Sequence, residues 1–245
     1  MVEAAEHTIG ARALGRVRFL DAGEPGWRPF VFFGGLGTDL SAFHVTEFAR
    51  LTRERLRLRA VSVERNGFGA TPFDPALTYG DAVDDVLAVL AALDIGRFAV
   101  VAVSGGAPFA AALAARVPER VLSLHLAAAV AGPLAARYGT AAAEYARPEQ
   151  LAADRALAHE WRLLSETPLP DLSGLYAPAF LYWGFADEVV PAAHLREWRR
   201  VLPTVAAVRG YPHEAHDVQY VHWRQILFDV AGLGWLRPAA RARTQ

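Results

Sequence analysis

One serine in the chain lies where a buried strand is followed at once by a helix. The run Phe98–Val103 is apolar throughout, and Ser104 separates it from an apolar helical pattern. A sharp strand-to-helix turn needs small residues on both sides, and Ala102, Gly105 and Gly106 meet that need. Such a turn exposes the hydroxyl at a helix N-terminus, where backbone N–H groups favour a developing anion. Ser104 is therefore a candidate nucleophile, and the competing interpretation is a helix-capping serine in an ordinary turn.

A serine nucleophile needs a histidine base, and the base needs a carboxylate that fixes its tautomer. Asp187 lies just past a strand-like run, at the sheet edge where Ser104 must also lie. The end of the preceding strand, Ala127–Gly132, is the other place for such an acid, and it contains none. The neighbouring Glu188 is expected to point elsewhere. Asp187 is therefore the candidate acid, with a turn or helix-capping residue as its alternative role.

Five segments in register resemble the motifs of the α/β-hydrolase family, and they extend over about residues 16 to 232. In chain order they are similar to the His-Gly loop, the Asp-Arg-x-Gly-x-Gly turn, the nucleophile elbow, the acid segment and the base segment: Val31–Gly37, Glu64–Gly69, Ala102–Gly106, Tyr182–Pro191 and Tyr211–His216. The order Ser, Asp, His is also the family's order. The resemblance implies an α/β-hydrolase fold, with a mostly parallel, doubly wound sheet flanked by helices, and a triad of Ser104, Asp187 and His216.

The sequence departs from the family's pattern most clearly at two positions. Ala102 replaces the first Gly of the elbow, and Gly34 replaces the His of the His-Gly loop. That imidazole is not needed for the chemistry but helps to hold the loop. We therefore expect a looser Gly34–Gly35 segment and slower turnover. The resemblance also implies that the backbone N–H groups of Leu36 and Gly105 form the oxyanion hole.

Two histidines are candidates for the base, His213 and His216. In the family the catalytic His follows a small residue and opens the last helix, a position that Ala215 and His216 match. His213 lies earlier, beside Pro212. We therefore assign the base to His216. His213, Glu214 and His216 superficially resemble a zinc site, but the spacing is one residue short of H-E-x-x-H in a loop, so no metal is expected.

Strand-like and helical patterns alternate along the chain, which favours one mostly parallel sheet with helices on both faces. Most of the strand-like runs are continuously apolar, as in strands buried on both faces: Arg16–Leu20, Pro29–Phe33, Leu58–Val63, Phe98–Val103, Val121–Ala127, Ala179–Trp183 and Val205–Arg209. Helical patterns occur at Asp39–Arg55, Tyr79–Leu93, Gly105–Arg116, Pro191–Leu202 and His216–Ala231. Residues 7–21 contain two short runs that could form an antiparallel hairpin at the edge.

One region interrupts this alternation. Residues 133–178 hold two or three helical patterns and no good strand, between two strands of the series. We interpret them as a small helical cap over the carboxyl edge of the sheet, with 1–132 and 179–236 as the core and 237–245 as a flexible tail. Aromatic residues are the candidate substrate contacts: Phe68, Tyr138, Tyr145 and Trp161. For Trp161, packing of the cap onto the sheet is the alternative role.

The composition excludes several kinds of chemistry. The 245 residues contain no Cys, which rules out thiol catalysis, disulfides and Cys-ligated metals. All 25 basic residues are Arg, so no Lys is available for a Schiff base or a phosphate-binding loop. With 26 acidic residues the formal net charge is −1, which disfavours nucleic-acid binding. A signal-peptide pattern and an apolar run of about 18 residues are both missing, so a cytoplasmic location is expected.

These observations predict a serine hydrolase that acts on a small, largely apolar ester or related acyl compound without a metal or organic cofactor. A small-molecule substrate is the expected partner, and neither a nucleic acid nor a membrane is expected. Two alternatives stay open. The same triad could serve carbon–carbon bond hydrolysis or a lyase reaction. The chain could also be a non-catalytic ligand-binding homologue, which the loss of the His at Gly34 would favour. Haloalkane dehalogenation would need an Asp nucleophile, and Ser104 argues against it.

Overall fold

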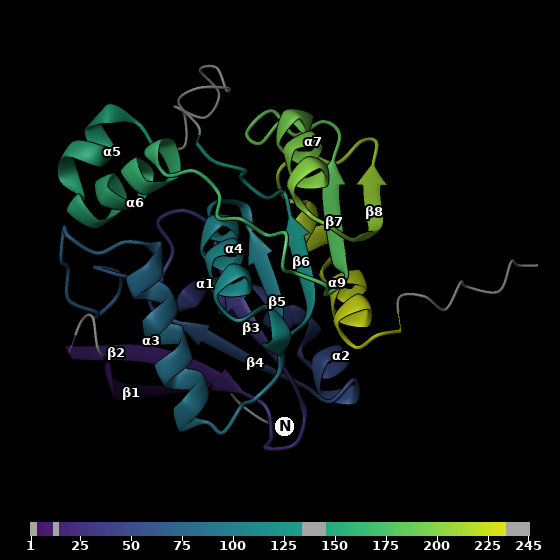
Figure 1. The fold of residues 1–245 in the computed structure, drawn as a ribbon, viewed down its shortest axis with the longest axis horizontal. Helices are drawn as coiled ribbons and strands as arrows, with labels where there is room; N and C mark the ends of the chain where they lie inside the picture. The colour runs from purple at the N-terminus through teal and green to yellow at the C-terminus, as the bar shows by residue number, and fades with distance from the viewer. Residues whose placement is uncertain (1–3, 12–14, 134–145, 234–245) are drawn as a thin grey trace, which may run out of the picture.

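A single eight-stranded sheet organises the protein (Figure 1). The computed structural model describes residues 4–11, 15–133 and 146–233. The strands are β1 (Ala5–Ala11), β2 (Gly15–Ala22), β3 (Arg28–Phe33), β4 (Leu58–Val63), β5 (Phe98–Val103), β6 (Val121–Ala127), β7 (Ala179–Gly184) and β8 (Val205–Tyr211). Their order across the sheet is β1-β2-β4-β3-β5-β6-β7-β8. Strands β3 to β8 pair in parallel, whereas β2 is antiparallel to both β1 and β4. The predicted fold class is confirmed.

The strands follow the apolar runs of the sequence closely. Every side chain of β4, β5 and β7 is buried, because helices cover both faces of the parallel part of the sheet. The edge hairpin predicted near the N-terminus is also present, as β1 and β2. All seven predicted strands therefore exist, with ends within two residues of those expected.

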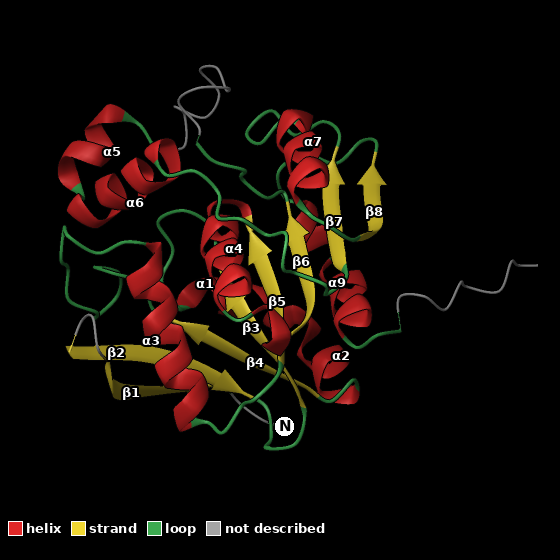
Figure 2. Ribbon diagram, in the orientation of Figure 1, coloured by secondary structure: helices red, strands yellow, loops and turns green. Residues whose placement is uncertain are grey.

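Helices cover the two faces of the sheet (Figure 2). They are α1 (Ser41–His44), α2 (Arg50–Arg55), α3 (Tyr79–Ala92), α4 (Ala107–Arg116), α5 (Pro148–Ala153), α6 (Arg155–Glu166), α7 (Ala192–Val201), α8 (Val218–Val221) and α9 (Trp223–Val230), with short 3₁₀ turns at Val45–Ala49, Ser104–Gly106 and Pro118–Arg120. One apolar core joins the sheet to α3, α4 and α7, and a second joins it to α1 and α9. Within the described residues, none of these helices has the length and hydropathy that crossing a membrane requires.

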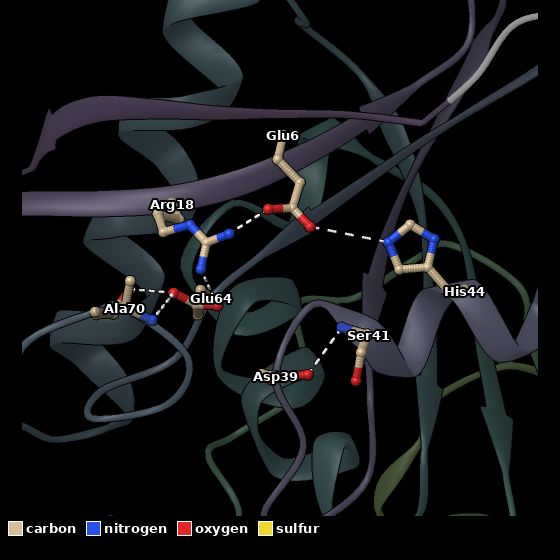
Figure 3. A network of polar contacts seen from close by, with 8 residues as sticks. Glu6, Arg18, Asp39, Ser41, His44, Glu64 and Ala70 are labelled. Carbon is tan, nitrogen blue, oxygen red and sulfur yellow. Dashed lines mark hydrogen bonds and ion pairs between the residues drawn. The ribbon is translucent and has the colours of Figure 1, made fainter.

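The helix predicted over Asp39–Arg55 is interrupted in the structure. It consists of α1, a 3₁₀ turn and α2 instead of one continuous helix. The β-branched pair Val45 and Thr46 lies at the break, where the Thr46 hydroxyl donates to the carbonyl oxygen of Phe43 at 2.7 Å. The carboxylate of Asp39 accepts the N–H of Ser41 at 2.8 Å, in the turn that leads into α1 (Figure 3). The last predicted helix likewise divides into α8 and α9.

The turn that follows β4 is held by the carboxylate of Glu64 (Figure 3). This carboxylate accepts the N–H of Ala70 at 3.0 Å and the hydroxyl of Thr71 at 2.9 Å. Arg18 of β2 lies between Glu64 and Glu6, and pairs with both. The turn is therefore anchored to the edge hairpin, and it positions the residue after Glu64 beneath the loop that follows β3.

Helices α5 and α6 come between β6 and β7 in the chain, and Figure 1 shows them to one side of the sheet. Asp154 caps α6 by accepting the N–H of Leu157 at 3.0 Å. A ring nitrogen of His159 donates to the carbonyl oxygen of Leu77 at 2.8 Å, which ties α6 to the segment before α3. The division into core and cap stays a prediction, and the predicted tail lies outside the described residues.

A buried polar network crosses the second core. The Tyr182 hydroxyl donates to Asp229 at 2.8 Å, so it accepts the Nδ1–H of His125 at 2.9 Å. The other ring nitrogen of His125 then accepts from the hydroxyl of Ser123 at 2.8 Å, and Arg209 pairs with Asp229 at 2.6 Å. Burial lowers the pKa of His125 to about 3. The histidine is therefore neutral, and the network satisfies both ring nitrogens.

Buried neutral histidines make the folded state sensitive to acid. Burial also lowers the pKa of His194 to about 4. In the unfolded chain both groups have a pKa near 6.5, so the unfolded state binds protons first as the pH falls. Stability is complete above about pH 6.5 and is lost toward the folded pKa values, by about 2 kcal/mol per histidine between about pH 7 and 5.

Urea unfolding of the wild type and of His125→Gln at these two pH values tests this linkage. We expect the variant to lose about half of the pH-dependent change, whatever its stability at neutral pH. An identical pH dependence in both proteins would show that His125 does not contribute to it.

Candidate active site

The turn between β5 and α4 is tightly packed against the end of β3. Ser104 has a φ of +49°, in the left-handed region that residues with side chains rarely adopt. A Cβ atom on Gly106 would collide with the carbonyl oxygen of Gly34 and lie 2.7 Å from that of Phe33. A Cβ on Gly105 would lie 2.9 Å from the backbone nitrogen of Leu36. The predicted strained elbow is present, and this close approach requires glycine at positions 105 and 106.

Three residues predicted to form a triad lie in hydrogen-bond contact. Nε2 of His216 is 3.1 Å from Oγ of Ser104, and Nδ1 is 2.9 Å from Oδ2 of Asp187. The other oxygen of Asp187 accepts the backbone N–H groups of Val189 at 2.9 Å and Val190 at 2.8 Å. Because the carboxylate accepts from Nδ1–H, Nε2 is the nitrogen that can accept the proton of Ser104. The geometry is that of a serine nucleophile with an oriented base.

A close approach between two loops brings the acid and the base together. A Cβ on Gly184, at the end of β7, would collide with the carbonyl oxygens of Glu214 and Ala215. Glycine at this position lets the loop before α8 lie directly on the end of β7. The alternatives are placed elsewhere, since Glu188 and His213 are both exposed. Among the described residues, no three His, Asp or Glu side chains converge as a metal site would require.

The two predicted oxyanion donors lie next to each other beside the serine. Leu36 lines the same cavity as Ser104, and its nitrogen would lie 2.9 Å from a Cβ at position 105. The loop that carries Leu36 lacks the family's imidazole at position 34, but other contacts restrain it. The hydroxyl of Thr38 donates to the carbonyl oxygen of Gly35 at 2.9 Å. The role of these two N–H groups stays a prediction that the geometry permits.

An open cavity of about 430 Å³ leads to the serine hydroxyl. It is lined by Gly35, Leu36, Thr38, Val103, Ser104, Ala215, His216, Asp217, Gln219 and Tyr220. Sequence reasoning did not single out several of these, among them Thr38, Gln219 and Tyr220. Gln219 and Tyr220 follow His216 by three and four residues, so helical spacing from the base could have indicated them. The Gln219 side chain is buried, and its amide oxygen has no hydrogen-bond partner among the described residues.

The predicted substrate contacts are not among the described residues that line this cavity. Phe68 is buried beside Arg65, with the guanidinium carbon 5.7 Å from the ring centroid. Trp161 lies on α6 and packs partly buried against the first apolar core. Tyr138 and Tyr145 lie outside the described residues. The packing role that was the alternative for Trp161 agrees with its position, and the four substrate contacts stay predictions.

A family model for the alpha/beta hydrolase fold matches residues 28–154, which is more than half of the chain. The chain therefore belongs to the α/β-hydrolase fold family, as its motifs predicted. No curated protein sequence gives a match.

Solved structures with the same fold are distant in sequence. A membrane phospholipase A described as a bacterial virulence factor has a TM-score of 0.74 at 23% identity, over 94% of this chain and 87% of that one. The hydrolase of 2-hydroxy-6-oxo-6-phenylhexa-2,4-dienoate from Rhodococcus sp. strain RHA1 has a TM-score of 0.74 at 19% identity, over 94% and 99% of the two chains. A thermophilic esterase from Thermogutta terrifontis has a TM-score of 0.69 at 18% identity, over 94% and 97%. At these identities the similarity shows the fold alone.

The tight elbow predicts how two glycines differ. Gly106→Ala should lower the free energy of unfolding by about 1–3 kcal/mol, because its methyl group has no room against the end of β3. Gly96→Ala is the matched control, since no heavy atom lies within 4 Å of a Cβ at that position. Urea unfolding of both variants compares them. Equal stability of the two would show that the elbow can relax around a side chain.

Proposed function

We propose that this protein is a serine hydrolase that forms an acyl-enzyme with a small, largely apolar ester or related acyl compound. The observation that carries the proposal is the unbroken hydrogen-bonded chain from Asp187 through His216 to Ser104, at the wall of an open cavity. The fold alone does not define a reaction, so the proposal depends on this site and not on the family.

In the first half of the proposed reaction, Oγ of Ser104 attacks the acyl carbon while Nε2 of His216 takes the hydroxyl proton. The carboxylate of Asp187 holds the ring in position and stabilises the imidazolium that forms. The backbone N–H groups of Leu36 and Gly105 stabilise the oxygen of the tetrahedral intermediate. His216 then returns the proton to the leaving alcohol, and the acyl group remains on the serine.

In the second half, water replaces the alcohol. His216 takes a proton from the water as it attacks the acyl carbon, and the same two N–H groups stabilise the second intermediate. Collapse of this intermediate releases the acid and restores the hydroxyl of Ser104. Each step uses side chains or backbone groups of this chain, and every proton passes through one ring nitrogen.

The lining of the cavity disfavours an anionic substrate. Of the described residues that line it, none is an Arg, so no guanidinium is available there to pair with a carboxylate or phosphate. Leu36, Val103, Ala215 and Tyr220 offer apolar surface, and the amide of Gln219 offers a buried polar group besides the Ser104 hydroxyl. Proteins of similar structure include esterases and an enol-lactonase, which supports a substrate with an acyl carbon.

Replacing the proposed nucleophile provides the first test. Ser104→Ala should lower the hydrolysis rate of p-nitrophenyl esters by about 1,000-fold or more, as removal of one triad member does elsewhere. Ser173→Ala is the control, because Ser173 is exposed and its hydroxyl donates to the carboxylate of Asp171 at 2.9 Å. A fluorophosphonate should label the wild type and not the Ser104 variant. Full ester turnover in Ser104→Ala would refute the mechanism. If the wild type hydrolysed carbon–carbon bonds and no esters, the proposed ester substrate would be wrong.

The two histidines of the loop before α8 provide the second test. His216→Ala should lower the rate nearly as much as Ser104→Ala, because the members of a triad act as one unit. His213→Ala should keep most of the activity, since His213 is exposed on the same loop. Steady-state rates with a short-chain p-nitrophenyl ester distinguish the variants. The reverse ranking would assign the base to His213.

A further inference from the structure

A single arginine side chain links three carbonyl groups of the loop after β3. Arg65 donates from Nη1 to the carbonyl oxygen of Gly34 at 2.8 Å, and from Nη2 to those of Gly35 at 2.6 Å and Thr38 at 3.1 Å. Arg65 follows the end of β4 by two residues and is 7% exposed. The guanidinium therefore contacts the carbonyl side of the loop that carries Leu36, and it does not line the cavity at Ser104.

The carbonyl of Gly35 is the important one, because it belongs to the same peptide group as the N–H of Leu36. In a planar trans peptide the C=O and N–H bonds point in opposite directions. Two donors, Nη2 of Arg65 and the hydroxyl of Thr38, hold this carbonyl. The N–H of Leu36 must then point away from Arg65, on the side where Gly105 lies. Rotation of this one peptide would remove a proposed oxyanion donor.

The loop has no room for the side chain that the family places at its start. A Cβ on Gly34 would lie 2.5 Å from the hydroxyl oxygen of Thr38 and 2.9 Å from the Cβ of Ala42. The hydroxyl of Thr38 therefore occupies the space into which an imidazole at position 34 would begin to extend. Thr38 and Arg65 supply the restraints that Gly34 cannot supply.

The charge of Arg65 is compensated from another part of the chain. Oε1 of Glu160, on α6, lies 3.2 Å from Nη2 of Arg65. The guanidinium carbon also lies 5.1 Å from the ring centroid of Phe109 on α4. Burial raises the pKa of Glu160, and the neighbouring guanidinium opposes this shift. An unpaired charge is costly in this buried place, so the contact with Glu160 makes the position of Arg65 depend on the position of α6.

We propose that Arg65 is a positioning residue for the oxyanion hole, which orients the Gly35–Leu36 peptide through its carbonyl, and that Glu160 of α6 holds Arg65 in place. This inference rests on the proposed function, because it concerns the donor that Leu36 would supply. Neither Arg65 nor Glu160 touches the reacting atoms. The segment between β6 and β7 thereby affects the rate of the chemical step and not only the access of substrate.

The kinetic test compares Arg65→Gln and Arg65→Lys with the wild type on a p-nitrophenyl ester. We expect Arg65→Gln to lower kcat by about 10- to 100-fold with little change in KM, because the lost donor acts on the transition state. Arg65→Lys should recover part of the loss, since an ammonium keeps the charge but not the fork. An unchanged kcat, or a change confined to KM, would overturn the proposal.

Arg53 provides a matched control for the loss of a buried guanidinium. It is 1% exposed, and it donates to the carbonyl oxygens of Ala22 at 2.6 Å and Leu58 at 3.3 Å. Arg53→Gln should lower stability without lowering kcat per folded molecule. If Arg65→Gln lost activity only in proportion to its unfolded fraction, as Arg53→Gln should, Arg65 would be structural and the proposal wrong.

The role of Glu160 has its own test. Glu160→Gln should lower kcat in the same direction as Arg65→Gln but by less, and the double variant should lose less than the two single losses multiplied together. Multiplication of the two losses would show that Glu160 acts independently of Arg65. That result would overturn the part of the proposal that concerns α6.

A structural readout separates this inference from the proposed function. A crystal structure of Arg65→Gln should show the Gly35–Leu36 peptide rotated from its wild-type orientation, and that of Arg65→Lys, the variant to use if Arg65→Gln does not fold, should show a smaller rotation. An unrotated peptide, in a protein whose wild type reacts with a fluorophosphonate at Ser104, would overturn the positioning role alone. Failure of the wild type to react would overturn the proposed function. The orientation of the peptide can be read from a crystal structure even if the protein has no ester turnover, so the two outcomes are distinguishable.

Discussion

The close approach between the end of β3 and the turn after β5 is the constraint on which the rest of the site depends. Ser104 is held with a left-handed φ, which costs of the order of 1–3 kcal/mol. The conformation persists because β5 is buried along its length and α4 packs on it through fully buried small residues: Ala107, Ala110, Ala111 and Ala114. Gly106 then fits against the carbonyl groups of β3. The packing of β5, α4 and Gly106 therefore holds Ser104 in its strained conformation.

The order of the strands decides which loops meet at this point. Strand β3 has β4 on one side and β5 on the other, so three loops from separate parts of the chain converge at their carboxyl ends. They supply Gly35, Arg65 and Ser104, and the loops after β7 and β8 supply Asp187 and His216. The site is thus a property of the sheet edge, where parallel strands end together.

A buried ion pair fixes the geometry at this edge of the sheet. The Arg65–Glu160 pair is almost wholly buried, and a pair of this kind contributes little net stability compared with apolar packing. It contributes geometry instead, because a guanidinium can donate to several oxygens at fixed angles. Arg53 shows the same use of arginine at the opposite face, where it joins two carbonyl groups without any nearby chemistry. In a chain without Lys, arginine fills both kinds of role.

The sequence by itself determined the strands, the elbow and the chain order of the three residues proposed as a triad. Those features depend on neighbours in the chain: apolar runs define strands buried on both faces, and small residues around Ser104 permit a sharp turn. The motifs near Asp187 and His216 then indicated the partners of the serine. Local patterns were less reliable for the helix over Asp39–Arg55, because its periodicity did not reveal the break at Val45 and Thr46.

Only the tertiary structure decided what surrounds the triad. Arg65 and Gly34 are 31 residues apart, and Glu160 reaches Arg65 from a helix much later in the chain. No periodicity or short motif encodes such a contact, since it depends on how the strands are ordered. The same holds for Gln219 in the cavity wall and for Trp161 against the core. Whether a side chain of a given type faces a cavity or a core depends on the packing of elements that are distant in sequence. That packing is determined only in the folded structure.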